Sequence, residues 1–298
     1  AFPTRTVVGG VPQPRAMAVG DMNGDGRPDI VVASLNLSFA GIMINLGGGQ
    51  FTGFDGTFPT GSGPNGLALA DVDGDGHLDV VVADYSGGSV SVLHGDGSDQ
   101  LGPKTDYTTG AGAFVATVGD LDGDGRPEIV CANSTGNTIS VLPNLGASFG
   151  PAVNLAVTNP ADVAIGDLNG DGRADLVSAD YSTQKVNVLL GNGGAMFATR
   201  KDLPLGSTPN AVAIGDVSGD GVPDLVVTNS GTDAVSVLLG NGSGGFAPRV
   251  DYATLPGPFG VAIADLNADG RPDLVVNTVV GYACVLLGTG AGAFAAHV

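Results

Sequence analysis

The sequence contains no tryptophan and only two cysteines, and aromatic residues make up only 5% of its 298 residues. It has no run of about 18 apolar residues, so we expect no segment that spans a bilayer. Apolar residues still amount to 43%, which is enough for a core and argues against a disordered polymer. The 51 glycines favour many short strands and tight turns over long helices.

Basic residues are also scarce, with 11 against 30 acidic residues and a net charge of −19. Nucleic acid and anionic membranes both require a cationic surface, so we expect neither as a partner. Glutamate is almost absent, because Glu128 is the single glutamate among the 30 acids. The short carboxylate of aspartate is therefore selected, and the positions of the aspartates show why.

Most of the aspartates belong to one nine-residue string that occurs six times. The string starts at Asp21, Asp71, Asp120, Asp167, Asp216 and Asp265, so successive starts lie 47 to 50 residues apart. Six units of about 49 residues use essentially the whole chain, which predicts a single domain spanning residues 1–298. A parallel β-helix is excluded because its repeat is about nine residues long.

Each unit has the alternation and turns of four short strands. Before each string, a large apolar residue is followed by glycine or alanine, which suits strands crowded around a common axis. An apolar run such as 30–33 follows the string, then a third strand such as 90–93, and a fourth strand led by phenylalanine, such as 246–252. The pattern predicts an all-β, six-bladed β-propeller of four-stranded antiparallel blades.

The two ends of the chain both match the fourth strand of a unit. The segment that begins at Phe2 aligns with the one at Phe246, and the chain stops just after the corresponding Phe294. We expect residues 1–8 to pair into the last blade and close the ring, which would remove exposed sheet edges. Whether this segment replaces the C-terminal strand or lies beside it is left open.

The aspartate-rich strings have the pattern of calcium-binding loops. Oxygen side chains at positions 1, 3, 5 and 9 can converge with the backbone carbonyl of position 7, and calcium accepts about 6–8 oxygen ligands. Glycine at position 6 permits the sharp bend. We therefore predict up to six bound Ca²⁺ ions, one per blade. The candidate ligands are Asp21, Asn23, Asp25, Arg27, Asp29, Asp71, Asp73, Asp75, His77, Asp79, Asp120, Asp122, Asp124, Arg126, Glu128, Asp167, Asn169, Asp171, Arg173, Asp175, Asp216, Ser218, Asp220, Val222, Asp224, Asp265, Asn267, Asp269, Arg271 and Asp273.

Two other interpretations of the string were weighed. Asp-Gly is a common hairpin turn, so a single copy could be only a turn; six copies in register need another reason for their acids. An EF-hand is excluded because the acid at position 12 and the flanking helices are missing. Two carboxylates about 4.5 Å apart repel by about 3–4 kcal/mol at an effective dielectric near 20, which favours a cation between them.

The motif Asp-x-(Asp/Asn)-Gly-Asp-Gly-x-x-Asp resembles that of the FG-GAP/VCBS repeat family, whose members include the propellers of integrin α chains. The strings at Asp21, Asp71 and Asp167 match it fully, whereas Glu128, Ser218 and Ala268 depart from it. The six short repeats are more similar to bacterial secreted repeats and to integrin-like propeller lectins of mushrooms than to integrins. The resemblance implies an extracellular, calcium-stabilised scaffold, secreted or on the cell surface.

We expect this scaffold to be a non-catalytic interaction or adhesion module, monomeric or part of a larger chain, with a protein or glycan ligand. Its binding surface would lie opposite the calcium loops, at an aligned set of polar residues with Tyr85 and Tyr181 beside two of them: Ser34, Asp84, Asn133, Asp180, Asn229 and Thr278. The alternative explanation is that these residues only start turns. The start at Ala1 leads us to expect that any secretion signal was removed or never present.

Two other functions remain in view. A multivalent lectin would gain from repeated weak sites, although no exposed aromatic residue recurs in every blade. A polysaccharide-acting enzyme is less favoured, because His77, His94 and His297 lie in different repeats and no nucleophile motif accompanies them. Cys131 and Cys284 align with valine and serine positions of other units, and we expect no disulfide between them.

The six loops should not bind calcium equally. The loop at Asp71 has four aspartates and should bind most tightly, whereas the loop at Asp216 has Ser218 at position 3 and should lose its ion first. Calcium titration by calorimetry, with anomalous scattering to identify the filled sites, tests this order. Finding the Asp216 loop among the tightest sites would refute it.

Overall fold

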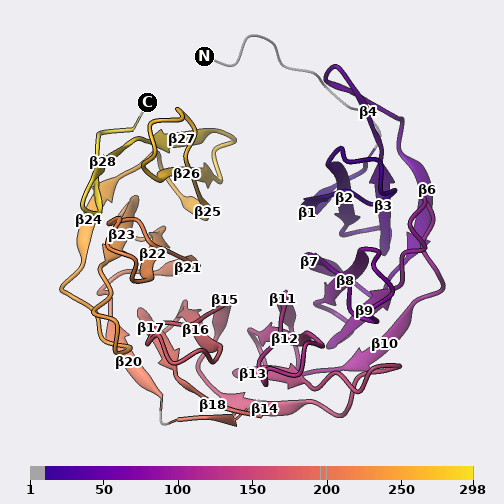
Figure 1. Cartoon of the computed structure of the whole chain (residues 1–298), viewed down its shortest axis with the longest axis horizontal. Helices are drawn as coiled ribbons and strands as arrows, with labels where there is room; N and C mark the ends of the chain where they lie inside the picture. Colours follow the sequence, from indigo (N-terminus) through magenta and orange to yellow (C-terminus); the bar gives the residue numbers. More distant parts are fainter. Residues whose placement is uncertain (1–10, 195, 199, 298) are drawn as a thin grey trace. The chain divides into compact units, whose positions relative to one another are not determined.

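The computed structural model describes residues 11–194, 196–198 and 200–297. Within these ranges every regular element is a β-strand, and no helix is long and apolar enough to cross a membrane. The strands form successive antiparallel sheets in which neighbours along the chain are paired (Figure 1). This is the all-β, six-bladed β-propeller fold that the repeats predicted.

The chain divides into two compact units, Ala1–Gly119 with Gly125–Leu155, and Asp120–Asp124 with Ala156–Val298. The first unit contains blade one, β1 (Pro14–Gly20), β2 (Asp29–Ser34), β3 (Phe39–Met43) and β6 (Asp55–Pro59); blade two, β7 (Pro64–Ala70), β8 (Asp79–Asp84), β9 (Ser89–Leu93) and β10 (Thr105–Thr108); and blade three, β11 (Ala113–Gly119), β12 (Glu128–Asn133), β13 (Thr138–Leu142) and β14 (Val153–Ala156).

The second unit repeats the pattern. It contains blade four, β15 (Pro160–Gly166), β16 (Asp175–Asp180), β17 (Lys185–Leu189) and β20 (Lys201–Pro204); blade five, β21 (Pro209–Gly215), β22 (Asp224–Asn229), β23 (Ala234–Leu238) and β24 (Val250–Ala253); and blade six, β25 (Pro258–Ala264), β26 (Asp273–Thr278) and β27 (Ala283–Leu286). Three blades carry a short hairpin after the third strand, formed by β4 (Asn45–Gly47) with β5 (Gln50–Phe51), β18 (Gly191–Gly193) with β19 (Met196–Phe197), and β28 (Gly288–Gly290) with β29 (Ala293–Phe294).

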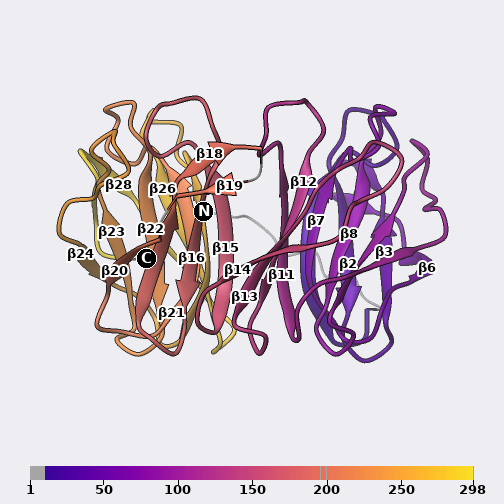
Figure 2. The ribbon, with the colours of Figure 1, turned by 90° about the horizontal axis from the view of Figure 1, so that it is seen from below.

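Blade six has three strands within the described residues. The predicted closing strand, residues 1–8, lies outside the described part of the chain, so ring closure stays a prediction. In each blade the strands run lengthwise between two ends that carry the loops (Figure 2).

The core of each unit lies between neighbouring blades. Val81 and Val92 of blade two pack with Ile129 and Leu142 of blade three, all with at most 1% of their surface exposed. The second and third strands are buried on both faces, which explains their continuous apolar runs in place of alternation.

The first strands of neighbouring blades fit together through the small residue before each loop. A Cβ on Gly215 would lie 3.0 Å from Ile263 Cδ1, and one on Gly20 would lie 3.0 Å from Leu69 Cδ1. The large apolar residue of one blade therefore occupies the space left by the glycine of the blade before it. The expected crowding of the first strands is confirmed within each unit.

The phenylalanine that was expected to lead the fourth strand has a different role. In blade five the strand begins at Val250, and Phe246 forms only an isolated bridge with Gly240. In the third and sixth repeats this phenylalanine contacts the preceding blade: Phe149 lies edge-on to Tyr107 at 5.3 Å between ring centroids, and Phe294 lies edge-on to Tyr252 at 5.4 Å. The predicted strand 246–252 was therefore too long, since an apolar anchor was taken for a strand start.

Candidate metal-binding loops

Each nine-residue string forms the loop between the first and second strands of its blade. The ninth residue is the first residue of the second strand, and it pairs with the small residue before the string, as Ala70 does with Asp79. The ninth carboxylates are all buried, with at most 1% of each residue exposed: Asp29, Asp79, Glu128, Asp175, Asp224 and Asp273.

The ninth carboxylate joins two separate parts of its blade. Asp175 Oδ2 accepts a hydrogen bond from Leu168 N at 2.8 Å, and Oδ1 accepts one from Gly191 N at 2.7 Å. The same bond to the second residue after the third strand recurs in the other blades, from the backbone nitrogens of Asn45, Gly95, Asn144, Gly240 and Gly288. This residue fixes the loop to the end of the third strand.

The first carboxylate organises the loop itself. Asp71 Oδ1 accepts from Gly74 N at 2.7 Å and Asp75 N at 3.2 Å, and Oδ2 accepts from Gly76 N at 2.9 Å. In the loop at Asp167, burial raises the pKa of the Asp167 carboxyl. Hydrogen bonds from four backbone N–H groups outweigh the burial and hold this pKa below its usual value. Asp167 is thus kept ionised.

The third and fifth side chains continue this pattern, with Asp75 Oδ1 accepting from His77 N at 2.8 Å. The bend requires left-handed backbone, and Gly76 has a φ of 91°. At the fourth position of the last loop Ala268 adopts a φ of 59°, where other loops have glycine. An alanine in this conformation costs about 1 kcal/mol, so this loop carries local strain.

The seventh residue has a role that the sequence argument did not foresee. Its side chain, where it is arginine, pairs with the fifth aspartate in three loops: Arg27 with Asp25, Arg173 with Asp171 at 3.8 Å, and Arg271 with Asp269 at 2.9 Å. These arginines partly neutralise the loop charge. The repulsion between the loop carboxylates is therefore weaker than the acids alone would give, and the arginine two residues after the fifth acid is visible in the sequence.

In the loops at Asp71 and Asp120, acidic oxygens converge closely enough to hold one ion. One oxygen each from Asp71, Asp73 and Asp75 lie within 4.8 Å of one another, and Asp120, Asp122 and Glu128 form a similar group. Three carboxylates with no sulfur ligand match the donor set of a hard divalent cation such as calcium. These six acids therefore fit such an ion, while acids of the loops also serve as acceptors for the loop backbone.

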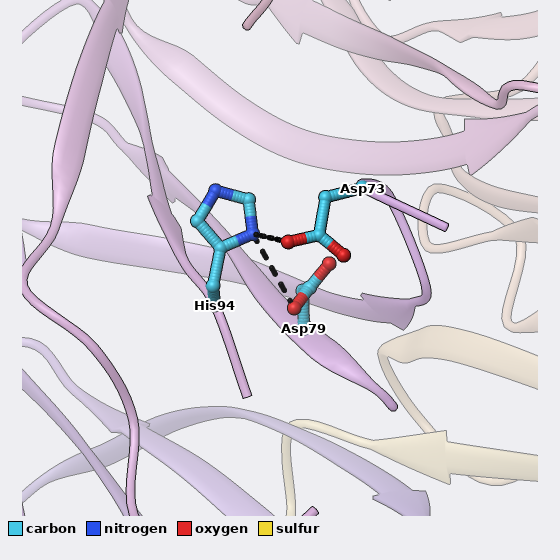
Figure 3. A group of neighbouring side chains, drawn as sticks. All are labelled: Asp73, Asp79 and His94. Atoms are coloured by element: carbon cyan, nitrogen blue, oxygen red, sulfur yellow. Dashed lines mark ion pairs between the residues drawn. The ribbon is translucent and has the colours of Figure 1, made fainter. Parts of the chain in front are cut away.

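A histidine that was not predicted as a ligand joins the loop at Asp71. His94 directs its imidazole ring at Asp73 and Asp79 (Figure 3), with Nδ1 3.2 Å from Asp73 Oδ2 and 3.4 Å from Asp79 Oδ1. His77, in contrast, is exposed. The sequence signal for His94 was its place at a position occupied mostly by leucine in other blades.

The polar set expected to line a binding surface is buried instead. Ser34, Asp84, Asn133, Asp180, Asn229 and Thr278 end the second strands, and each is at most 7% exposed. They hydrogen-bond within their own blades, as Asn133 Nδ2 does to Ser140 Oγ at 2.8 Å. The prediction that these residues form an exposed ring was wrong, whereas Tyr85 and Tyr181 are 37% and 47% exposed.

An open groove of about 470 Å³ lies between the fourth strand of blade two and the Phe149 segment of blade three. Asp106, Tyr107 and Asn154 contribute polar groups to its lining, with Phe149 and Pro151 on the apolar side. Sequence reasoning missed this groove, because its two walls come from different repeats.

Both cysteines are buried and free.

The repeats match a known family. Five overlapping segments match the FG-GAP-like repeat: 21–82, 71–131, 120–178, 167–227 and 216–276. No curated protein matches the chain in sequence.

Solved structures of low identity share the fold. A lectin of Agrocybe aegerita that recognises non-reducing terminal N-acetylglucosamine is 22% identical, with 97% of this chain and 80% of the lectin covered and a TM-score of 0.67. A putative 6-phosphogluconolactonase of Bacteroides fragilis is 15% identical, with 96% and 83% covered and a TM-score of 0.70. The biofilm matrix protein Bap1 of Vibrio cholerae is 18% identical, with 85% and 41% covered and a TM-score of 0.52.

The ninth carboxylate should stabilise the fold even without a metal ion. In Asp175→Asn the new amide nitrogen faces one of the two backbone N–H donors, so that buried donor loses its acceptor. We expect a loss of about 1–3 kcal/mol in the free energy of unfolding, measured by urea denaturation in chelator.

Asp171→Asn is the matched control in the same loop. The Asp171 side chain is 36% exposed, and its Oδ1 accepts from Arg173 N, a bond that an amide oxygen can also make. Its stability in chelator should stay close to that of the parent protein. Equal losses in the two variants would contradict the role assigned to Asp175.

Proposed function

Because the chain belongs to the FG-GAP-like repeat family, we propose that it is a calcium-stabilised, non-catalytic binding module that acts outside the cell. The observation that carries the proposal is the convergence of the Asp71, Asp73 and Asp75 carboxylates within 4.8 Å. A bound Ca²⁺ would neutralise these groups and tie the loop ends together, which stabilises the blade.

The first, third, fifth and ninth side chains of each loop would hold the ion, with the backbone carbonyl of the seventh residue. Calcium sites of extracellular modules have dissociation constants of about 10⁻⁴–10⁻³ M and are filled only where calcium is millimolar. This supports a location outside the cytosol, as does the likeness in fold to a biofilm matrix protein. The expected ligand is a protein or a glycan.

Carbohydrate binding is the second candidate function, and the groove beside Tyr107 favours it. Carboxylate and amide groups that hydrogen-bond sugar hydroxyls, here Asp106 and Asn154, stand beside an apolar wall in an open groove of about 470 Å³. The likeness in fold to a lectin agrees with this reading. Enzymatic activity has less support, because the sequence carries no recognisable nucleophile motif.

Calcium should raise the stability of the protein. At about one hundred times the dissociation constant, each occupied site adds about 2.7 kcal/mol to the free energy of unfolding. Thermal unfolding in millimolar CaCl₂ should therefore occur at a clearly higher temperature than in chelator, with MgCl₂ as the control for ionic strength and charge. Identical midpoints in calcium, magnesium and chelator would refute the proposal.

A glycan array probed in calcium separates the two candidate ligand classes. Binding that is lost in Asn154→Ala, with the unfolding midpoint unchanged, would assign the groove to sugars. An array without any binder would remove the lectin reading and leave a protein ligand as the expected partner.

A further inference from the structure

The loop at Asp71 differs from the other five by one nitrogen donor. The residue that follows the third strand is His94 in blade two, whereas the equivalent residues elsewhere carry no metal-binding side chain: Ile44, Pro143, Leu190, Leu239 and Leu287. The fold therefore tolerates several different side chains at the position after the third strand. The histidine is not required by the fold.

The His94 ring stands where a metal ligand would. Nδ1 has almost no exposed surface and makes no hydrogen bond among the described residues, while Asp73 Oδ2 and Asp79 Oδ1 lie 3.2 and 3.4 Å away (Figure 3). Ligand atoms at about 2.0–2.2 Å from a tetrahedral zinc ion are separated by about 3.4 Å. The two distances from His94 Nδ1 match such an ion, and one ligand atom from each of the three residues lies within 4.8 Å of the other two.

We propose that the loop at Asp71 binds a transition-metal ion of the zinc class through His94 Nδ1, Asp73 and Asp79. Imidazole nitrogen suits zinc, copper, iron and nickel, whereas calcium is bound almost entirely by oxygen. The other loops offer oxygen donors and aliphatic or proline residues at this position, so their preference for calcium is unaffected. Asp73 also belongs to the group that carries the calcium proposal, so the two ions compete for it in this loop. The inference does not depend on calcium in the other loops.

Cobalt titration followed by visible absorption tests the site, with zinc as the competing ion. The variant is His94→Leu, because leucine occupies this position in three other blades and should fold. We expect the parent protein to bind one Co²⁺ at least about tenfold more tightly than His94→Leu, with Zn²⁺ displacing it. His297→Ala, which removes a histidine outside the loops, should bind like the parent.

Calcium calorimetry on the same proteins separates this inference from the proposed function. Equal cobalt affinity in the parent and His94→Leu overturns the His94 site, whether or not calcium binds. Cobalt binding that depends on His94 in a protein without calcium affinity supports the site and refutes the calcium scaffold. Loss of cobalt binding in His297→Ala would assign the metal to another histidine and overturn the site.

A second inference concerns a buried carboxyl at the other end of β8. Ser91 Oγ lies 2.7 Å from Asp84 Oδ2 and also 2.7 Å from Asp106 Oδ1, and it accepts a hydrogen bond from Gly61 N at 2.8 Å. A hydroxyl has one hydrogen and can donate to only one of two carboxylates. If Asp84 and Asp106 were both ionised, Ser91 Oγ would share its hydrogen with only one of them. It would face the other carboxylate oxygen at 2.7 Å with no hydrogen between the two atoms.

Blade five shows how the same arrangement is satisfied. There Asn229 Nδ2 donates to Ser236 Oγ at 2.7 Å, and Ser236 Oγ donates to Asp251 Oδ1 at 2.5 Å. The side-chain oxygen of Asn229, Oδ1, has no hydrogen-bond partner among the described residues, and neither has Asp84 Oδ1. Asp84 Oδ2 thus occupies the place of an amide donor, and Asp84 Oδ1 the place of an amide carbonyl.

We propose that Asp84 is a neutral carboxylic acid in the folded protein and donates its proton to Ser91 Oγ, whose own hydrogen goes to Asp106. The chain of hydrogen bonds then runs in one direction through β8, β9 and β10, as it does in blade five. Ionisation of Asp84 removes the donor and sets two negative groups against one hydroxyl. Blade two therefore contains a pH-sensitive link that the other blades replace with asparagine or another pairing.

The surrounding charges agree with this assignment. Lys104 pairs with Asp106; burial raises the pKa of Asp106, but Lys104 and Ser91 outweigh the burial and lower it. Burial, with the Asp106 charge, raises the pKa of Asp84 to about 7. Cys131 of β12 is the other titratable group that interacts with Asp84, and burial keeps its thiol neutral by raising its pKa to about 12.

The test compares the parent with Asp84→Asn from pH 4 to 8 in saturating calcium. A group whose folded pKa is raised stabilises fully below its unfolded pKa, and this contribution is lost as pH rises through the folded pKa. Relative to Asp84→Asn, the folding constant of the parent should therefore fall by up to about tenfold per pH unit between about 4 and 7, and then level off. Asn229→Asp in the Asp84→Asn background should restore the pH dependence in blade five.

Carbon-13 NMR of the aspartate carboxyls gives a direct readout. The Asp84 carboxyl should show the shift of a protonated acid at pH 6 and titrate near neutrality. An ionised Asp84 at pH 6 would overturn the proposal. A ratio of the folding constants of parent and Asp84→Asn that does not change with pH would also overturn it. So would failure of Asp84→Asn to fold, because the asparagine amide should donate to Ser91 Oγ as the protonated Asp84 does.

Discussion

Each blade depends on one buried carboxylate that accepts backbone hydrogen bonds from two directions. The ninth residue of the loop, Asp175 for example, binds the backbone at the start of its own loop and the backbone after the third strand. A buried charge is tolerated only with such partners, because desolvation of an unpaired carboxylate is costly. The loop thus has a fixed shape before any metal ion binds, and a cation finds its ligands already arranged.

The loop acids therefore serve two purposes, and the sequence alone could not separate them. Asp71 accepts three backbone N–H groups, and Asp75 accepts another, so part of the motif is explained by loop geometry. Arginine at the seventh position also supplies positive charge next to the fifth acid, as Arg271 does for Asp269. What remains for calcium is the convergence of three carboxylates in the loop at Asp71, where the seventh residue is histidine.

The fold was predictable because strand periodicity and the repeat length constrain it independently. The apolar runs at 30–33 and 225–227 lie within β2 and β22, and the small residue at Gly215 indeed faces the large Ile263 of the next blade. The starts of the fourth strands were less predictable, because Phe246 is held by packing and by a single isolated bridge to Gly240, outside the strand that begins at Val250. The groove beside Tyr107 could not be derived at all, since its walls meet only after two repeats have folded.

The buried polar residues show a more general limit of reasoning from turn propensity. Asp84 and Asn229 stand where a chain turns, and turn-forming residues are usually exposed. Here each is also the last residue of a strand, and the pleat directs its side chain into the blade, where a serine of the third strand receives it. Asparagine and aspartate are then no longer interchangeable, because only one of them is always a donor. Six copies of one blade make such differences visible. The residues that the blades share form the fold, whereas Asp84 and His94 give blade two chemical properties that we do not infer for the other blades.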